Sequence, residues 1–229
     1  MVTGRPTRIV LVDDHVLVRS GMRALLDAQP DLEVTGEASD GAEGVELALN
    51  SHPDVVLMDL AMPVLDGIEA TKRIIAAGSR ARILVVTSHD DDTLVLRALR
   101  AGATGFFLKD AAADRLAEAV RAVAKGDTLL APPIAKRLVE SQLGTSGTRL
   151  ALRPRFNSLT ERERDIVRRL ARGLSNAALA NELGLSEATI KTHVTRLLSK
   201  LGVRSRVQAV VLAYESGFVR PGHTGEADL

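Results

Sequence analysis

The sequence predicts two domains: an α/β domain with a doubly wound, five-stranded parallel sheet, and then a smaller all-α domain of four helices. Two observations predict this division. In the first half, short apolar runs alternate with helical patterns, and in the second half helical patterns follow one another with no strand between them. The stretch between the halves is rich in Gly, Ser, Thr, Arg and Pro, a composition typical of a linker.

The first half is predicted to form consecutive βα units whose sheet has the strand order 2-1-3-4-5. In such units the strands run parallel, and helices cover both faces of the sheet. The expected strands are residues 8–12, 33–38, 54–58, 82–87 and 104–108. The expected helices are residues 15–28, 41–50, 67–77, 92–101 and 113–125.

The formal charge is divided in the same way as the predicted structure. We assign residues 1–128 to the first domain, 129–157 to the linker, 158–220 to the second domain and 221–229 to a flexible tail. Residues 1–129 carry a net charge of −6 and residues 158–220 carry +5, although the whole chain carries only +1. A basic second half suggests nucleic acid as a partner of that half alone.

The composition excludes several classes of chemistry. The chain of 229 residues has no Cys, which excludes disulfides, Cys-ligated zinc and thiol nucleophiles. No apolar run approaches the roughly 18 residues that span a bilayer, and residues 1–7 do not have the pattern of a signal peptide. We therefore expect a cytoplasmic protein without a membrane partner.

Polar residues stand where the predicted strands end. Asp13 and Asp14 follow the first strand, Asp59 ends the third, Thr87 ends the fourth and Lys109 follows the fifth. Because the carboxyl ends of parallel strands meet at one edge of the sheet, we expect these residues to be neighbours. Three carboxylates suit Mg²⁺. Asp59, on the central strand, is the candidate nucleophile for a phosphoryl group whose charge the metal and Lys109 would neutralise.

Each of these residues also has an ordinary structural explanation when it is taken alone. Asp13 or Asp14 could cap the helix that follows, Thr87 could be a plain strand residue, and Lys109 could be a solvated charge. The segment 63–67 contains Pro and Asp-Gly, which favour a turn. Their joint placement at one edge of the sheet favours a functional site.

Four motifs carry a resemblance to a known family: VLVDDH, VVLMDLAMPVLDG, ILVVTSH and AGATGFFLKD. They resemble the flavodoxin-like receiver domain of bacterial two-component response regulators, over residues 7–126. The resemblance implies that Asp59 accepts a phosphoryl group from a phosphohistidine of a sensor histidine kinase. It also implies Mg²⁺ bound by Asp14, Asp59 and the backbone carbonyl of Ala61, with Asp13 helping through water.

The same resemblance assigns a switch and shows where this chain departs from the family. Thr87 and Lys109 would contact the phosphoryl group, and Phe106 stands where the family keeps an aromatic residue that swings inward with Thr87. Phe106 lacks the hydroxyl of the commoner Tyr, so a switch there works by packing alone. Asp110 follows Lys109, where many receivers have proline and one large subfamily also has Asp. Two further residues would flank the phosphate: Ala61 and His89.

The second half contains three helix starts with good capping residues. Thr160 and Glu163 have the spacing of a capping box, and Ser175 and Ser186 open two further helices. The helices opened by Ser175 and Ser186 are joined through the segment LGLS and match a helix-turn-helix. The second of them has an apolar stripe opposite a polar, cationic face. The stripe consists of Ile190, Val194, Leu197, Leu198 and Leu201, and the opposite face of Thr192, Thr195, Arg196 and Ser199.

A polar helix face of this kind is either a plain solvated surface or one that enters the major groove of DNA. The segment 159–210 resembles the LuxR-type DNA-binding domain along nearly its whole length. By that resemblance the base-reading residues are Lys191, Thr192 and Thr195, and His193 lies near the DNA backbone.

Further residues complete the predicted DNA-binding domain. Arg196 shares the DNA-facing side. The last helix, residues 204–216, is the family's dimerisation element, and Ala178 replaces the Glu that would complete a capping box at the second helix. Candidate dimer contacts are Val207, Ala209 and Val211, and candidate phosphate contacts are Arg162, Arg168, Arg172, Lys200 and Arg204.

The resemblances together predict a NarL-type response regulator, which is a phosphorylation-controlled transcription factor and not a turnover enzyme. Its expected partners are a sensor histidine kinase, double-stranded promoter DNA and a second copy of the chain, on phosphorylation or DNA binding. One alternative, an aspartyl-phosphate phosphatase, needs a second Asp where Ala61 stands. The other is a constitutive DNA-binding protein with an unphosphorylated receiver, which the complete set of site residues disfavours.

Overall fold

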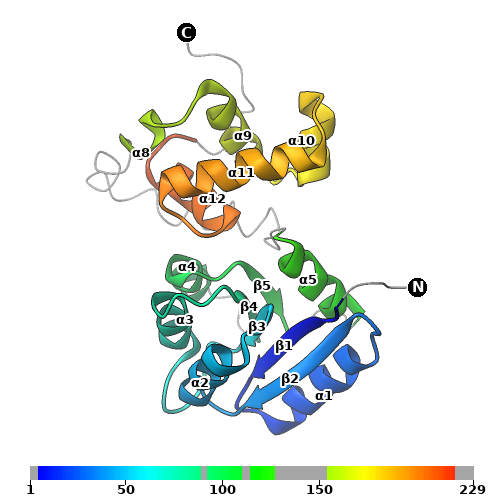
Figure 1. Ribbon diagram of the computed structural model, residues 1–229. Helices are drawn as coiled ribbons and strands as arrows, with labels where there is room; N and C mark the ends of the chain where they lie inside the picture. The colour runs from blue at the N-terminus through cyan, green and yellow to red at the C-terminus, as the bar shows by residue number, and fades with distance from the viewer. Residues whose placement is uncertain (1–4, 89–91, 110–113, 127–153, 220–229) are drawn as a thin grey trace. The chain divides into compact units, whose positions relative to one another are not determined.

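A computed structural model describes residues 5–88, 92–109, 114–126 and 154–219 of the chain (Figure 1). The chain divides into two compact units, Met1–Leu129 and Leu130–Leu229, and each is described by itself. Within the described residues, no helix is both long and apolar enough to cross a membrane.

The first unit contains the predicted parallel sheet. Its strand order is β2-β1-β3-β4-β5, and every neighbouring pair is parallel, as the sequence predicts. The ends of the strands differ from the predicted ends by at most one residue. The strands are β1 (Thr7–Val12), β2 (Leu32–Ala38), β3 (Val55–Met58), β4 (Arg82–Thr87) and β5 (Gly105–Leu108).

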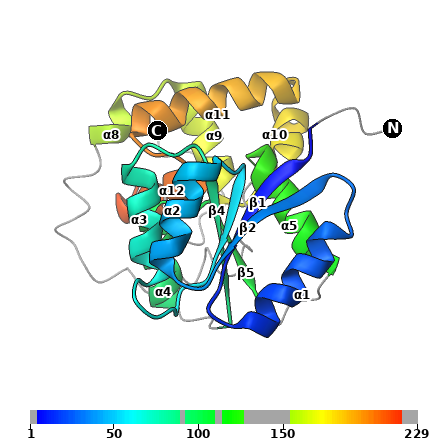
Figure 2. The same cartoon turned by 60° about the horizontal axis from the view of Figure 1, so that its bottom comes forward.

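Helices cover both faces of this sheet (Figures 1 and 2). The predicted helices are confirmed, again to within one residue at each end. On one face lie α1 (Val16–Asp27) and α5 (Asp114–Lys125). On the other lie α2 (Gly41–Ser51), α3 (Gly67–Ala76) and α4 (Asp92–Ala101).

The position of β3 in the middle of the sheet explains why its sequence is an unbroken apolar run. Leu57 packs in the core between the sheet and the helices α1 and α5. Val56 and Met58 point to the opposite face, where they pack with Ala70 and Ile74 of α3. A strand covered by helices on both sides has no solvent-facing position, so it needs no polar residue until it reaches the edge of the sheet.

The second unit is helical, and the four predicted helices are present. They are α9 (Glu161–Ala171), α10 (Asn176–Leu183), α11 (Glu187–Leu201) and α12 (Arg206–Glu215). A further short helix, α8 (Pro154–Asn157), precedes them. Its Phe156 is buried, and its ring stacks on Phe218 with 4.4 Å between the centroids.

The packing of α8 changes one predicted boundary. The linker was expected to extend through residue 157, but Phe156 lies in the core of the helical unit, so this unit begins no later than Pro154. A long-range aromatic contact leaves no local signal in the sequence. Residues 129–153 and the predicted tail, 221–229, lie outside the described residues.

The predicted helix caps are confirmed in the helical unit. Thr160 and Glu163 form the complete capping box of α9. At α10 the hydroxyl of Ser175 accepts a hydrogen bond from the backbone N–H of Ala178. The side chain of Ala178 has no acceptor, so this second helix has one half of the box.

Candidate functional site

The carboxyl edge of the sheet brings charged residues from three strands together. Asp13 follows β1, Asp59 follows β3 and Lys109 follows β5. The backbone N–H of Asp59 donates to the carbonyl of Val12 at 2.9 Å, and the N–H of Lys109 donates to the carbonyl of Thr87 at 2.9 Å. The strand pairing therefore continues to these residues and fixes the backbone from which their side chains extend.

Lys109 bridges two buried carboxylates. Its Nζ lies 2.7 Å from an oxygen of Asp13 and 2.7 Å from an oxygen of Asp59. Asp13 is fully buried, Asp59 is 4 % exposed and the Lys109 side chain is 13 % exposed. Burial lowers the pKa of Lys109, but the hydrogen bonds to Asp13 and Asp59 outweigh it and hold this pKa above its ordinary value of 10.5. The ammonium group is therefore charged at neutral pH and balances part of the charge of the two acids.

The position of Asp59 depends on a close backbone approach by Gly67. The Asp59 Oδ1 accepts a hydrogen bond from the N–H of Leu60 at 2.7 Å, and Gly67 N–H donates to the Leu60 carbonyl at 3.0 Å. A Cβ atom at residue 67 would lie 1.8 Å from the carbonyl oxygen of Asp59. The sequence predicts a turn here from Asp66–Gly67, but it carries no signal of this contact.

Asp14 and His15 extend the acidic cluster toward solvent. Single donor atoms of Asp13, Asp14, His15 and Asp59 all lie within 4.8 Å of one another. The buried Asp13 Oδ2 has the Lys109 ammonium beside it at 2.7 Å and no other hydrogen-bond donor among the described residues. Carboxylate oxygens with free lone pairs are the ligands that Mg²⁺ prefers, so these residues fit that cation.

The acids do not serve as the cap of α1, which was the simpler explanation of their position. The N-cap residue is His15, and its side chain makes no capping hydrogen bond. The Asp13 Oδ1 instead accepts a hydrogen bond from the backbone N–H of His15 at 2.9 Å. Asp13 is thereby held at the sheet edge, with its other oxygen facing Lys109.

The structure describes some of the remaining predicted residues of this site. Thr87 and Phe106 are both buried, on the adjacent strands β4 and β5. Ala61 is exposed in the loop after Asp59. His89 and Asp110 lie outside the described residues.

Sequence reasoning missed one residue that supports the acidic cluster. Arg19 of α1 donates from its Nη1 to the carbonyl oxygen of Asp13 at 2.5 Å, and its Nε pairs with Glu37 of β2 at 3.0 Å. The guanidinium thus ties α1 and β2 to the backbone that precedes Asp14. An Arg in the second turn of a helix is ordinary in a sequence, and a contact to a backbone carbonyl cannot be anticipated from residue types.

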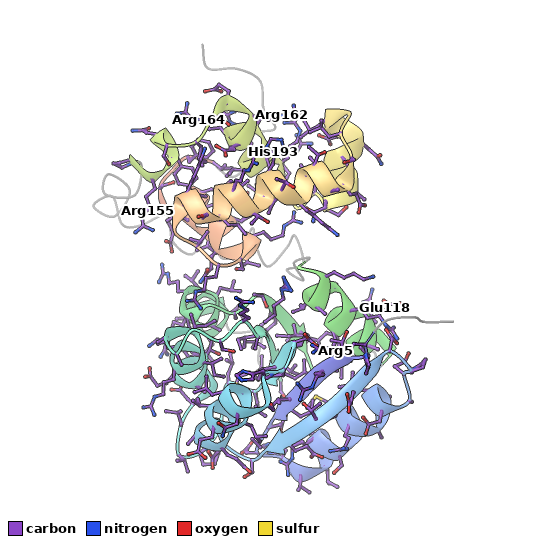
Figure 3. The ribbon with its side chains drawn as sticks, viewed as in Figure 1. Arg5, Glu118, Arg155, Arg162, Arg164 and His193 are labelled. Carbon is purple, nitrogen blue, oxygen red and sulfur yellow. The ribbon has the colours of Figure 1, made fainter. Side chains whose placement is uncertain are left out.

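In the helical unit, α11 has the predicted polar face, and Figure 3 labels His193 on this helix. Lys191, Thr192, Thr195 and Arg196 are exposed, whereas His193 is half-buried. The stripe on the opposite side packs into the core, where Ile190, Leu197 and Leu201 are buried and Val194 and Leu198 lie against them.

The two threonine hydroxyls of this face are already used as donors. Thr192 Oγ1 donates to the carbonyl of Ala188 at 3.0 Å, and Thr195 Oγ1 donates to the carbonyl of Lys191 at 2.9 Å. These bonds leave a methyl group and the acceptor lone pairs of each threonine available to a ligand.

Several of the basic residues expected at the DNA phosphates have partners within the unit. Lys200 Nζ lies 2.7 Å from the buried Glu163, and Arg172 lies 3.2 Å from Glu182. Arg162 donates to the Leu183 carbonyl at 3.0 Å, and Arg168 lies 5.4 Å from the ring centroid of Phe218. Arg204 is exposed. Arg162 and Arg164 on α9 and Arg155 on α8 are labelled in Figure 3.

The predicted dimer residues on α12 differ in how much surface they offer. Val207 and Ala209 are buried, and Ala209 belongs to the core of the helical unit. Val211 is half-buried. Among these three side chains, Val211 has the most surface for contact with a second copy of the chain.

Family comparisons match both units. The family described as "Response regulator receiver domain" matches residues 9–121, and the family described as "Bacterial regulatory proteins, luxR family" matches residues 157–213. Together the two matches define a class of protein in which a receiver domain precedes a LuxR-type DNA-binding domain.

Individual relatives match across almost the whole chain. The transcriptional regulatory protein LiaR of Bacillus subtilis is 45 % identical over 212 residues, which cover 93 % of this chain and 99 % of the relative. The nitrate/nitrite response regulator protein NarL of Escherichia coli is 37 % identical, with 92 % and 96 % covered. A solved structure of the response regulator ChrA, from a heme-sensing two-component system, is 37 % identical with a TM-score of 0.50 and covers 93 % of this chain and 99 % of its own.

The chain belongs to the response regulators of the NarL/FixJ type. It is a regulator of transcription in a two-component system, as the motifs of both halves predict.

Proposed function

We propose that Asp59 receives a phosphoryl group from a phosphohistidine of a sensor kinase, and that this modification controls how the helical unit binds promoter DNA. The observation that carries the proposal is the position of Lys109, whose ammonium lies 2.7 Å from both Asp13 and Asp59. A cation held against two buried acids is suited to accept a third negatively charged group beside them.

The transfer step uses groups of this chain. A carboxylate oxygen of Asp59 attacks phosphorus, the O–P bond forms as the P–N bond breaks, and the imidazole nitrogen keeps the bonding electron pair. Lys109 balances charge on the transferred group, and the Leu60 N–H holds the Asp59 Oδ1 at 2.7 Å. Mg²⁺, when held by Asp14, Asp59 and the Ala61 carbonyl with Asp13 through water, supplies further positive charge at this point.

Thr87 and Phe106 are proposed to transmit the change. Both side chains are buried on neighbouring strands, so a hydrogen bond from the Thr87 hydroxyl to the phosphoryl group alters the space available to Phe106. A phosphoryl group adds a charge of about −1.5 to −2 and several acceptor oxygens, which favours one of two receiver states.

On the DNA side we propose that α11 enters the major groove. Lys191 would donate to a base edge, with Arg196 and His193 toward the DNA backbone. Because the hydroxyls of Thr192 and Thr195 donate within the helix, these residues would contact bases through their methyl groups or as acceptors. A dimer formed through α12, with Val211 at its surface, would bind a two-fold DNA site.

The phosphorylation proposal is tested on the full chain with acetyl phosphate and Mg²⁺. Intact-mass spectrometry should show one added phosphoryl group, and the Asp59→Asn variant should show none. DNA affinity and oligomeric state should change with beryllofluoride and Mg²⁺. An unmodified wild-type chain would overturn the proposal, and a modified chain with unchanged oligomeric state and DNA affinity would identify a constitutive DNA-binding protein.

The DNA contact is tested with Lys191→Ala. We expect the loss of about 1–3 kcal/mol of specific binding, because one donor to a base edge is removed. Lys72→Ala, which removes an exposed cation from α3 in the first unit, serves as the control. Titrations on specific and random DNA separate the two roles of Lys191, since an equal loss on both would assign it to the phosphate backbone.

A further inference from the structure

His15 stands at the acidic site without a role in the proposed phosphoryl transfer. It directly follows Asp13 and Asp14, and its side chain is 68 % exposed. Its ring nonetheless faces the acids, because the Nδ1 lies 2.8 Å from the Asp14 Oδ1 and 3.9 Å from the Asp13 Oδ1.

The backbone at His15 is fixed by hydrogen bonds, and a hydrogen bond between the His15 Nδ1 and the Asp14 Oδ1 orients the ring. The His15 N–H donates to Asp13 at 2.9 Å, and Arg19 holds the Asp13 carbonyl. The imidazole therefore begins from a rigid position at the start of α1, while its exposed side leaves it free to adjust. It contributes the one nitrogen donor to a group of four residues whose donor atoms lie within 4.8 Å.

A nitrogen donor changes which cations a site prefers. Mg²⁺ takes oxygen ligands and keeps several waters, whereas imidazole is a good ligand for Zn²⁺, Ni²⁺ and Cu²⁺. Two ligands at right angles, each about 2.1 Å from one metal, lie about 3 Å apart. The His15 Nδ1 and the Asp14 Oδ1 share a hydrogen bond of 2.8 Å, so a cation that displaced its proton would find both atoms at a spacing compatible with two ligands of one metal.

We infer that His15 is a fourth ligand for transition-metal cations at this site, one that Mg²⁺ does not use. The inference rests on the proposed function, because it places both kinds of cation at the same carboxylates. Ni²⁺, Co²⁺ or Cu²⁺ would gain a nitrogen ligand on replacing Mg²⁺ and would compete with it at the phosphoacceptor. The site would thus distinguish between divalent cations through a residue outside the transfer chemistry.

The test compares cation affinities of the full chain by calorimetry. Wild type, His15→Gln and the control His52→Asn are titrated with Ni²⁺ and with Mg²⁺. His52 is exposed at the end of α2 with φ 47°, a conformation that Asn tolerates. We expect His15→Gln to lower the ratio of Ni²⁺ to Mg²⁺ affinity by roughly tenfold or more, and His52→Asn to leave this ratio unchanged.

A spectroscopic readout checks the ligand directly. Cu²⁺ bound to the wild-type chain should show nitrogen hyperfine coupling in its electron paramagnetic resonance spectrum, and the coupling should be lost in His15→Gln but kept in His52→Asn. Equal affinity ratios in wild type and His15→Gln would overturn the inference. The proposed function fails by a different result, namely the absence of Mg²⁺-dependent phosphorylation of Asp59 in the wild type.

Discussion

In the first unit Asp13, Asp59 and Lys109 are largely withdrawn from water, whereas on α11 of the helical unit the candidate DNA contacts other than His193 are exposed. Asp13, Asp59 and Lys109 converge from three strands. Lys191 and Arg196 extend from a single helix into solvent. Phosphoryl transfer requires several charged side chains to converge on one point, whereas recognition of DNA bases requires only one face of a helix. Stability and function are therefore coupled in the first unit and separable in the second.

The largest effect should come from Lys109→Gln, which removes the cation between two buried acids. Without divalent cations, the first unit should lose about 3–5 kcal/mol of unfolding free energy, because Asp13 and Asp59 are left without a counter-charge. Urea unfolding followed by circular dichroism measures this loss. Lys200→Gln, whose side chain is 38 % exposed, is the control and should cost less. If Lys109→Gln and Lys200→Gln lowered the unfolding free energy equally, the proposed difference between the two units in the coupling of stability to function would be wrong.

Gly67→Ala is expected to have the next largest effect. The added Cβ would meet the carbonyl oxygen of Asp59, so the loop must shift at a cost of about 1–3 kcal/mol. Gly21→Ala is the matched control, because its Cβ would meet no atom within 4 Å and a helical Gly→Ala change stabilises by about 1 kcal/mol. Gly67→Ala should lower the urea midpoint and Gly21→Ala should raise it. A change of the same sign in both variants would contradict the close contact between Gly67 and the Asp59 carbonyl.

Glu163 is the buried acid of the helical unit, and its pH dependence tests whether its pair with Lys200 contributes to stability. Burial raises the pKa of Glu163, but hydrogen bonds from Lys200 and Thr160 outweigh it and hold the pKa below 4.5. Because the folded pKa is lowered, the contribution is present above pH 4.5 and is lost as the pH falls through the folded pKa.

Glu163→Gln keeps the capping box and removes the charge. We expect a loss of about 1 kcal/mol at pH 7, since Lys200 is partly exposed, and convergence of the wild-type and variant stabilities in acid. Tyr214 on α12 is the only Tyr of the chain, and there is no Trp, so its fluorescence follows this unit. If the unfolding free energies of wild type and Glu163→Gln changed in parallel as the pH fell, the charge pair of Glu163 and Lys200 would contribute nothing to stability.

The smallest effect is expected from Ala178→Glu, which would complete the capping box that α9 has and α10 lacks. We expect a gain of about 0.5–1 kcal/mol in the helical unit. Ala177→Glu places the same charge in the same first turn without the spacing of the box. The unfolding free energies of the two variants are compared in urea by Tyr214 fluorescence. Both variants gain the favourable interaction of Glu with the helix dipole, so their difference measures the hydrogen bond of the capping box.

Much of the fold could be predicted from the sequence because its signals are local. The run Val55–Met58 indicated a strand covered on both faces, and Thr160 with Glu163 indicated a helix start. The neighbours of Asp59 could be predicted from topology, since the carboxyl ends of parallel strands share one edge.

The remaining features depend on contacts between distant residues. That Lys109 lies between two acids follows from the reach of its side chain, and the contact of Gly67 with the Asp59 carbonyl follows from a loop path. The pairing of Phe156 with Phe218 joins the two ends of the helical unit and has no periodic signal. His15 gave no signal beyond its place beside two acids.

The stacked rings of Phe156 and Phe218 have a mechanical consequence. The chain enters the helical unit at α8 and leaves it after α12, and the two rings fasten these points together, with Arg168 over one of them. Tension on the chain before Pro154 is therefore shared with the end of α12 and does not act on α11 alone. A displacement of α8 therefore disturbs the packing of the segment that follows α12.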